Sequence, residues 1–224
     1  MVQSLGDGVW WYDLTGVNAA LVDDGGTVTL VDTGMPWDGN RLVAGLIDTG
    51  FEPRDVERIL LTHYDMDHVG GLSAFEQAGA TVYVGTADAN FVAGDRSPPL
   101  RNHKGALQRL TSPLVDAPDL PIEPLSDGET VGSFTAYHTS GHTPGHVSYV
   151  SESLSTALLG DLVREKRGRF HPSPWHLSYD IRDVRRSIQS LVEDAPSFEI
   201  AVPGHGTPFE RGGSDRLADL AARL

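Results

Sequence analysis

The sequence predicts an α/β protein in which two β-sheets pack against each other and carry helices on their outer faces. Short apolar strands alternate with helical patterns along most of the chain. Hairpin signals occur inside each half. The two halves also echo each other weakly, since two strands precede Asp32-Thr33-Gly34 in the first and Gly160-Asp161 in the second. Together these observations favour two packed sheets with helices outside.

The first half of the chain contains a predicted hairpin followed by alternating helices and strands. Two apolar runs, 17–22 and 28–31, flank the turn Asp23-Asp24-Gly25-Gly26, which is typical of paired strands. Glycines after two amphipathic segments mark the ends of predicted helices. The further elements expected here are helices at 41–48 and 72–77 and strands at 58–61 and 81–84.

Residues 88–125 interrupt this pattern with repeated prolines and one predicted helix, at 103–110. We interpret the segment as a surface excursion over the site, within one domain that spans 1–224, because long loops of this kind are often functional lids. Regular structure then resumes. The elements expected after the excursion are strands at 130–138, 147–150, 156–159 and 199–202, and helices at 181–192 and 215–224.

The charge of the chain limits its partners. It has 224 residues, with 31 acidic against 17 basic side chains and a formal charge of -14. Such a surface repels nucleic acid and anionic membranes, so a small-molecule substrate is expected. The first residues carry no secretory signal and no apolar run is long enough for a membrane span, which predicts a cytoplasmic protein. An acidic surface with only two lysines also suits a high-salt cytoplasm, as a hypothesis.

The segment after the strand at 58–61 carries four potential metal ligands. The chain has no cysteine, so imidazole and carboxylate are the available metal donors. His63, Asp65, Asp67 and His68 follow an apolar strand and precede Gly70-Gly71. A compact turn there can aim alternate side chains at one ion. The alternative is a polar loop in which Asp65 or Asp67 caps a helix.

Three further potential ligands stand near the ends of later strands. His142 lies between small residues, Asp161 follows Leu158-Leu159-Gly160, and His205 follows Pro203-Gly204. Strand ends that share one edge of a sheet bring such side chains together. The seven residues therefore predict one metal site.

Their order and spacing resemble the metallo-β-lactamase superfamily, with its H-x-H-x-D-H motif and a later His, Asp and His. The resemblance runs from about Leu21 to Phe209. It implies a four-layer αβ/βα sandwich with two divalent metal ions, most simply zinc, at one edge of the sheets. By this resemblance His63 and His142 hold the first ion, Asp67, His68 and His205 hold the second, Asp161 bridges them, and Asp32 orients the ligands from behind. His146 is expected to have a supporting role.

Asp65 departs from the superfamily motif, which has a histidine there. We expect its carboxylate to bind the first ion, as in the flavodiiron proteins, which the variation resembles; the alternative is that Asp65 points aside and this ion is lost or weakly bound. Asp65, Asp67 and Asp161 with a bridging hydroxide would cancel the four charges of two divalent ions. That balance makes iron or manganese possible beside zinc.

The resemblance favours a hydrolase in which a metal-activated hydroxide attacks an ester, lactone or thioester, with Asp67 also handling a proton. The alternatives are an iron-dependent oxidoreductase for oxygen or sulfur chemistry and a metal-binding protein without catalysis. A basic cluster after Asp161, which includes Arg164 and Arg167, predicts contact with an anionic substrate. The alternative for this cluster is a solvated loop.

Overall fold

Two β-sheets face each other in the structure, a computed structural model that describes all residues from 1 to 224. The first sheet has seven strands in sequence order, antiparallel from β1 to β4 and parallel from β4 to β7. Its strands are β1 (Val2–Gly6), β2 (Val9–Asp13), β3 (Asn18–Asp24), β4 (Thr27–Val31), β5 (Val56–Leu61), β6 (Thr81–Gly85) and β7 (Ile122–Leu125).

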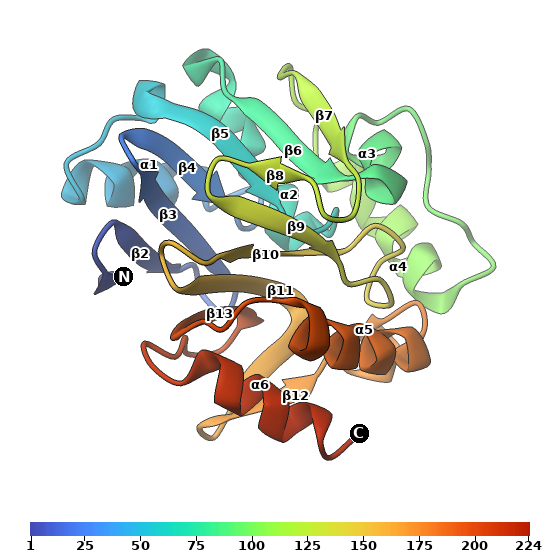
Figure 1. Cartoon of the computed structure of the whole chain (residues 1–224). Helices are drawn as coiled ribbons and strands as arrows, with labels where there is room; N and C mark the ends of the chain where they lie inside the picture. Colours follow the sequence, from blue (N-terminus) through green and yellow to red (C-terminus); the bar gives the residue numbers. More distant parts are fainter.

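The second sheet has six strands in the order β12-β11-β10-β9-β8, and β13 pairs in parallel with β11. Figure 1 shows this sheet lying against the first, with α5 and α6 on its outer side. Its strands are β8 (Thr130–Val131), β9 (Phe134–His138), β10 (Val147–Ser151), β11 (Thr156–Lys166), β12 (Arg169–Pro172) and β13 (Ile200–His205).

The helices cover the two outer faces. Against the first sheet pack α1 and the 3-10 helix η2, and against the second pack α5 and α6. None of the helices combines the length and apolar character needed to span a bilayer. The helices are α1 (Gly39–Asp48), α2 (Met66–Val69), α3 (Thr86–Val92), α4 (His103–Thr111), α5 (Ile181–Asp194), α6 (Gly213–Ala221), η1 (Pro53–Asp55), η2 (Leu72–Ala78), η3 (Ser112–Leu114) and η4 (Trp175–Leu177).

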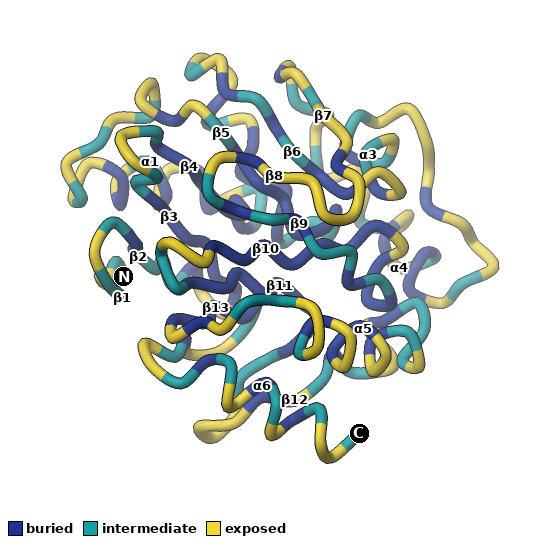
Figure 2. The backbone as a smooth tube through the Cα atoms, viewed as in Figure 1, coloured by how far each residue is buried: buried dark blue, intermediate teal, exposed yellow.

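Three apolar layers hold these elements together. One lies between the two sheets, and the other two lie between each sheet and its helices; Leu60 and Leu158, Leu42 and Ile59, and Ile188 and Leu159 are examples from the three. Figure 2 shows β10 and β11 buried along most of their length, while the outer turns are exposed. The predicted four-layer αβ/βα sandwich is confirmed.

The first half follows the predicted pattern with two differences. The hairpin is present as β3 and β4, with Gly25 and Gly26 at its turn. The predicted helix at 72–77 is a 3-10 helix. Strands β1 and β2 were not predicted; β1 is a half-exposed edge strand whose sequence lacks a clear apolar alternation.

The excursion at 88–125 is more regular than predicted. It begins inside α3, contains α4, and returns into the first sheet as β7, which pairs in parallel with β6. A second difference concerns Asp161, which lies within β11 and not at its end. The strand continues to Lys166, where it pairs with β12, and its pairing with β13 is irregular around Gly160, which has a φ of 52°.

Candidate metal centre

The structure brings all seven predicted ligands to one edge of the two sheets. Four of them surround the short helix α2, which follows β5. His142 comes from the loop between β9 and β10, Asp161 from the middle of β11, and His205 from the end of β13. The Asp65 side chain makes no capping hydrogen bond to α2, so the alternative of a simple helix cap does not describe it.

What we call the first half of the centre consists of His63, Asp65 and His142, together with Asp161. His142 Nε2 lies 3.2 Å from His63 Nε2 and 3.0 Å from Asp65 Oδ2. His63 Nε2 lies 3.3 Å from Asp65 Oδ2. One donor atom each from His63, His142 and Asp161 fall within 4.8 Å of one another, and all three residues are buried.

The second half consists of Asp67, His68 and His205, again together with Asp161. One donor atom from each of the first three lies within 4.8 Å of the others. Asp161 Oδ2 lies 3.2 Å from His205 Nε2 and 3.4 Å from His142 Nε2, so this carboxylate contacts both halves. His68 Nε2 and Asp161 Oδ1 are buried without a hydrogen-bond partner, and they lie 3.5 Å from each other. Unpaired buried polar atoms are costly, and a cation between them would satisfy both.

A single carboxylate behind the centre orients two of the imidazoles. Asp32 Oδ2 accepts hydrogen bonds from His68 Nδ1 at 2.7 Å and from Thr62 Oγ1 at 2.8 Å. Thr62 Oγ1 in turn accepts from His63 Nδ1 at 2.9 Å. With both Nδ1 atoms protonated, the neutral form of each imidazole presents an Nε2 lone pair to the centre, as a metal ligand requires. Burial lowers the pKa of His68, but Asp32 and Asp67 outweigh it and raise the pKa well above its usual range, so a metal ion displaces a proton from this imidazole.

The other two imidazoles are held in the same way. His142 Nδ1 donates to Ser173 Oγ at 2.8 Å, and His205 Nδ1 donates to the Gly16 carbonyl at 2.5 Å. Their Nε2 atoms therefore also face the centre. His146 lies behind His63, with a ring-to-ring distance of 5.3 Å, and its Nδ1 bonds to Thr139 Oγ1.

Close backbone packing fixes Asp161. A Cβ atom on Gly204 would lie 1.9 Å from Asp161 Oδ1, so only glycine fits beside the carboxylate. Gly204 immediately precedes His205 on β13, and it therefore lets the two ligands approach each other.

Burial and charge set the protonation of the centre. Burial and the nearby charge of Lys104 together lower the pKa of His142 to about 3, so this imidazole is neutral at neutral pH. Burial also lowers the pKa of His205, but Asp161 outweighs it and raises the value to about 9. Burial opposes ionisation of Asp161, yet His205 and His142 hold its pKa well below the usual range. Metal binding at His205 therefore displaces a proton.

Lys104, on α4, contacts two of the candidate ligands, and it was not predicted from the sequence. Its Nζ lies 2.7 Å from Asp65 Oδ2 and 2.5 Å from His142 Nε2, and its side chain is only 3% exposed. Gln108, one turn later on the same helix face, donates to the other oxygen of Asp65. The only hint in the sequence is that the chain has just two lysines, which does not by itself identify the partner of Asp65.

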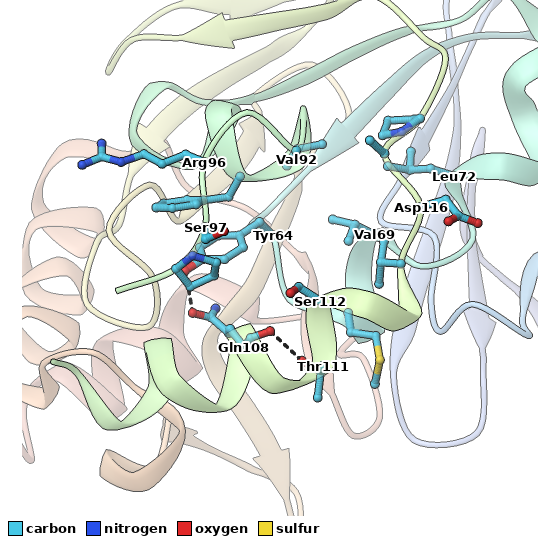
Figure 3. A pocket seen from close by; sticks show the side chains of 17 residues that line it. Tyr64, Val69, Leu72, Val92, Arg96, Ser97, Gln108, Thr111, Ser112 and Asp116 are labelled. Carbon is cyan, nitrogen blue, oxygen red and sulfur yellow. Dashed lines mark hydrogen bonds between the residues drawn. The ribbon is translucent and has the colours of Figure 1, made fainter. Parts of the chain in front are cut away.

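Gln108 also separates the centre from a pocket lined by both polar and apolar side chains. Its Oε1 accepts from Tyr64 at 2.5 Å and from Tyr179 at 2.8 Å. The pocket, of about 230 Å³, lies under α3 and α4, and Figure 3 shows Tyr64, Val92 and Gln108 in its wall. None of the seven predicted ligands lines it.

Comparison with known families agrees with this geometry. The family model described as "Metallo-beta-lactamase superfamily" matches residues 12–205, which covers the site from β2 to the last candidate ligand. This chain belongs to the metallo-beta-lactamase superfamily. It is accordingly a metallo-hydrolase-family enzyme, and members of this superfamily bind divalent metals.

Relatives of this superfamily member cover most of its length. The uncharacterized protein YobT of Bacillus subtilis is 31% identical over 90% of this chain and 87% of its own. The probable metallo-hydrolase YflN of the same organism is 28% identical over 87% and 81%. The hydroxyacylglutathione hydrolase GloC of Haemophilus influenzae is 25% identical over 85% and 81%. The metallo-beta-lactamase family protein TTHA1429 of Thermus thermophilus superposes with a TM-score of 0.73 at 27% identity, covering 98% of this chain and 80% of that one.

The two halves fit a divalent ion differently. In the second half, imidazole and carboxylate donors converge and two buried donor atoms lack partners, which suits a cation. In the first half, Lys104 already contacts Asp65 and His142. The Lys104 ammonium also changes the charge count, because it offsets the extra carboxylate of Asp65 that favoured iron or manganese.

The predicted anion contacts lie on the β11–β12 hairpin of this enzyme. Arg164 stands opposite His205 in the parallel pairing of β11 with β13. Arg167 lies at the exposed turn of the hairpin, at a φ of 56°. The segment is a strand pair with a solvent-exposed turn, and the contact of Arg164 and Arg167 with an anionic substrate stays a prediction.

Proposed function

We propose that this chain hydrolyses an activated acyl compound at a divalent metal ion, zinc most simply, held by Asp67, His68, Asp161 and His205. Two buried atoms carry this proposal, His68 Nε2 and Asp161 Oδ1, which have no hydrogen-bond partner and lie 3.5 Å apart. It is supported by the hydrogen bonds that direct Nε2 of every candidate histidine to the centre. A divalent ion bound there lowers the pKa of water toward neutrality and polarises a substrate carbonyl.

Asp67 is the residue placed to manage the proton. Its side chain is 25% exposed, whereas that of Asp161 is 8% exposed, and its Oδ2 lies 3.5 Å from His205 Nε2. Substrate therefore approaches from the side of Asp67 and His205, where the Asp67 carboxylate accepts the proton of the attacking water. Asp32 keeps His63 and His68 in the required tautomer throughout.

The substrate we favour is a thioester, ester or lactone that carries a negative charge. The similarity to GloC, named as a hydroxyacylglutathione hydrolase, supports the thioester. A surface groove of about 640 Å³ on the β11–β12 side supports the charge. No carboxylate lines it, although the chain is strongly acidic. Its lining is Arg164, Lys166, Arg167, Arg169, His171, Pro172 and Pro174.

This groove adjoins the centre through the segment Pro172-Ser173-Pro174. The two prolines line the groove, while Ser173 between them accepts the hydrogen bond of His142. Arg164 lies nearest along the chain to Asp161 and faces His205 in the strand pairing. We therefore assign the anion contact to Arg164 before Arg167. Arg164→Glu should raise KM for an anionic substrate, and Arg167→Glu should raise it less.

A substrate screen tests the proposal. Zinc-loaded protein is assayed against matched thioesters, esters and lactones, with Asp161→Ala as the inactive control. Hydrolysis of one class that disappears in the control and after chelation is expected. Absence of turnover with every class, in protein that holds zinc and is folded, would contradict the proposed function.

An iron-dependent oxidoreductase is the second candidate, and Asp65 is the observation that favours it. Oxygen consumption by iron-loaded protein, compared with hydrolysis by zinc-loaded protein, separates the two. Lys104 weighs against this candidate because its charge offsets that of Asp65. We expect hydrolysis and no metal-dependent oxygen uptake.

A further inference from the structure

Lys104 is a buried lysine in direct contact with two candidate metal ligands. Its Nζ contacts Asp65 Oδ2 at 2.7 Å and His142 Nε2 at 2.5 Å. An ammonium group is costly to bury unless it is paired. The other lysine of the chain, Lys166, is exposed on the β11–β12 hairpin. Lys104 is therefore held in the centre by specific partners.

Helix α4 places this ammonium group firmly. The Asn102 side chain caps the helix by accepting from the backbone N–H groups of Lys104 and Gly105. A Cβ on Gly105 would lie 2.3 Å from the Pro99 carbonyl, so glycine lets α4 pack closely at this point. Gln108 donates to Asp65 Oδ1 while Lys104 holds Oδ2. Both oxygens of Asp65 are thus engaged by one helix.

The two halves of the centre consequently differ in what they offer a cation. In the first half, the Nε2 lone pair of His142 and one oxygen of Asp65 already face the ammonium group. In the second half, His68 Nε2 and Asp161 Oδ1 are buried and unpaired. A divalent ion in the first half needs the same atoms that Lys104 contacts, and it would stand next to a buried positive charge.

We propose that Lys104 competes with metal for Asp65 and His142, so that the chain fills its second half first and fills its first half only when the ammonium group is displaced. At limiting metal the protein holds one ion, and Lys104 acts as a positioning residue that keeps Asp65 and His142 in place. The inference rests on the metal centre of the proposed function but does not depend on its hydrolytic reaction.

Metal counting on matched lysine variants tests the inference. Metal-free wild type, Lys104→Met and Lys166→Met are equilibrated with buffered zinc, and bound zinc per chain is measured over a range of free zinc. Wild type and Lys166→Met should hold one equivalent where Lys104→Met holds two. The second zinc ion should bind to Lys104→Met about tenfold or more tightly than to the wild type, because a full positive charge next to the ion has been removed. Two equal equivalents in wild type, or equal second affinities in all three proteins, would overturn the inference.

A measurement on the unaltered protein covers the case in which Lys104→Met does not fold. Wild type labelled with isotopic lysine has only two side-chain lysine signals, from Lys104 and Lys166. During a zinc titration the Lys104 signal should change mainly with the second equivalent, while the Lys166 signal stays constant. A change completed with the first equivalent, or two bound equivalents without any change, would refute the competition.

The two proposals can fail separately. Ordered uptake of zinc without hydrolysis of any acyl substrate would contradict the proposed function and leave the role of Lys104 standing. Hydrolysis by a protein that binds two zinc ions with equal affinity would support the proposed function and contradict the role of Lys104.

Discussion

Asp32 Oδ2 lies 2.7 Å from His68 Nδ1, and the same oxygen accepts the Thr62 hydroxyl that receives His63 Nδ1. One buried carboxylate thereby sets the tautomer of a histidine in each half of the centre. Asp32 also has a positive φ of 56°, a conformation that few residues other than glycine adopt readily. The backbone is held in this conformation where the carboxylate meets the ligands.

Asp32→Asn should weaken zinc binding by about 10- to 100-fold, because the amide nitrogen replaces an acceptor that two donors need. Competition with a chromophoric chelator measures the zinc affinity of each protein. Asp7→Asn, on the exposed turn between β1 and β2, is the matched control and should bind zinc like the wild type. Unchanged affinity in Asp32→Asn would show that the hydrogen bonds to Asp32 do not govern the ligands.

Gly204→Ala should displace Asp161, since the new methyl group would lie 1.9 Å from its carboxylate oxygen. Zinc binding should be lost while the far-ultraviolet circular dichroism stays close to that of the wild type. Gly25→Ala, at an open turn where a methyl group meets nothing within 4 Å, is a control for zinc affinity only, because its φ of 65° makes alanine strained there. A Gly204→Ala protein with wild-type zinc affinity would contradict the tight packing described.

Zinc should stabilise the native state by binding to it selectively. At a free zinc concentration about one hundred times Kd, the gain is about 2.7 kcal/mol. For a chain of this size that corresponds to a rise in Tm of roughly 5–10 °C. Thermal unfolding with and without chelator measures it. Asp161→Ala should show no zinc-dependent rise, and a rise equal to that of the wild type would place the bound zinc elsewhere.

Asp88 should make the metal-free protein less stable as the pH rises from about 4 to 7. Burial raises the pKa of this carboxyl to about 7, although Thr143 and Gly145 donate to it. Because the folded pKa lies above the unfolded one, the native state binds more protons in this window, and stability falls toward higher pH.

The test is urea unfolding of metal-free wild type and Asp88→Asn at several pH values. The difference in unfolding free energy between the two should shift in favour of Asp88→Asn by up to about 1.4 kcal/mol per pH unit across the window. A difference that does not depend on pH would mean that Asp88 does not carry the shift.

Strands β3 to β6 and the candidate ligands could be identified from the sequence because both depend on local pattern. The buried strand β5 is an apolar run, and the ligands after it form a compact motif. The extension of β11 to Lys166 was missed because polar residues after Asp161 pair with β12 and not with the core. That pairing is visible only in three dimensions.

Lys104 was missed for a related reason. A lysine in a short polar helix of a proline-rich segment ordinarily lies in solvent. Its burial follows from the return of the excursion into the first sheet as β7 and from the contacts of α4 with Tyr179. The partner of Asp65 therefore depends on chain topology that residue patterns do not encode.

The contact between Asp65 and Lys104 makes two positions that are far apart in the chain depend on each other. A change of Asp65 to histidine leaves the buried Lys104 ammonium group without its counterion. Loss of Lys104 leaves the Asp65 carboxylate without its positively charged partner. Descendants of this sequence should therefore substitute the two positions together. Residues 86–125 should fold in the same way in another protein only if an acidic side chain there is placed to pair with Lys104.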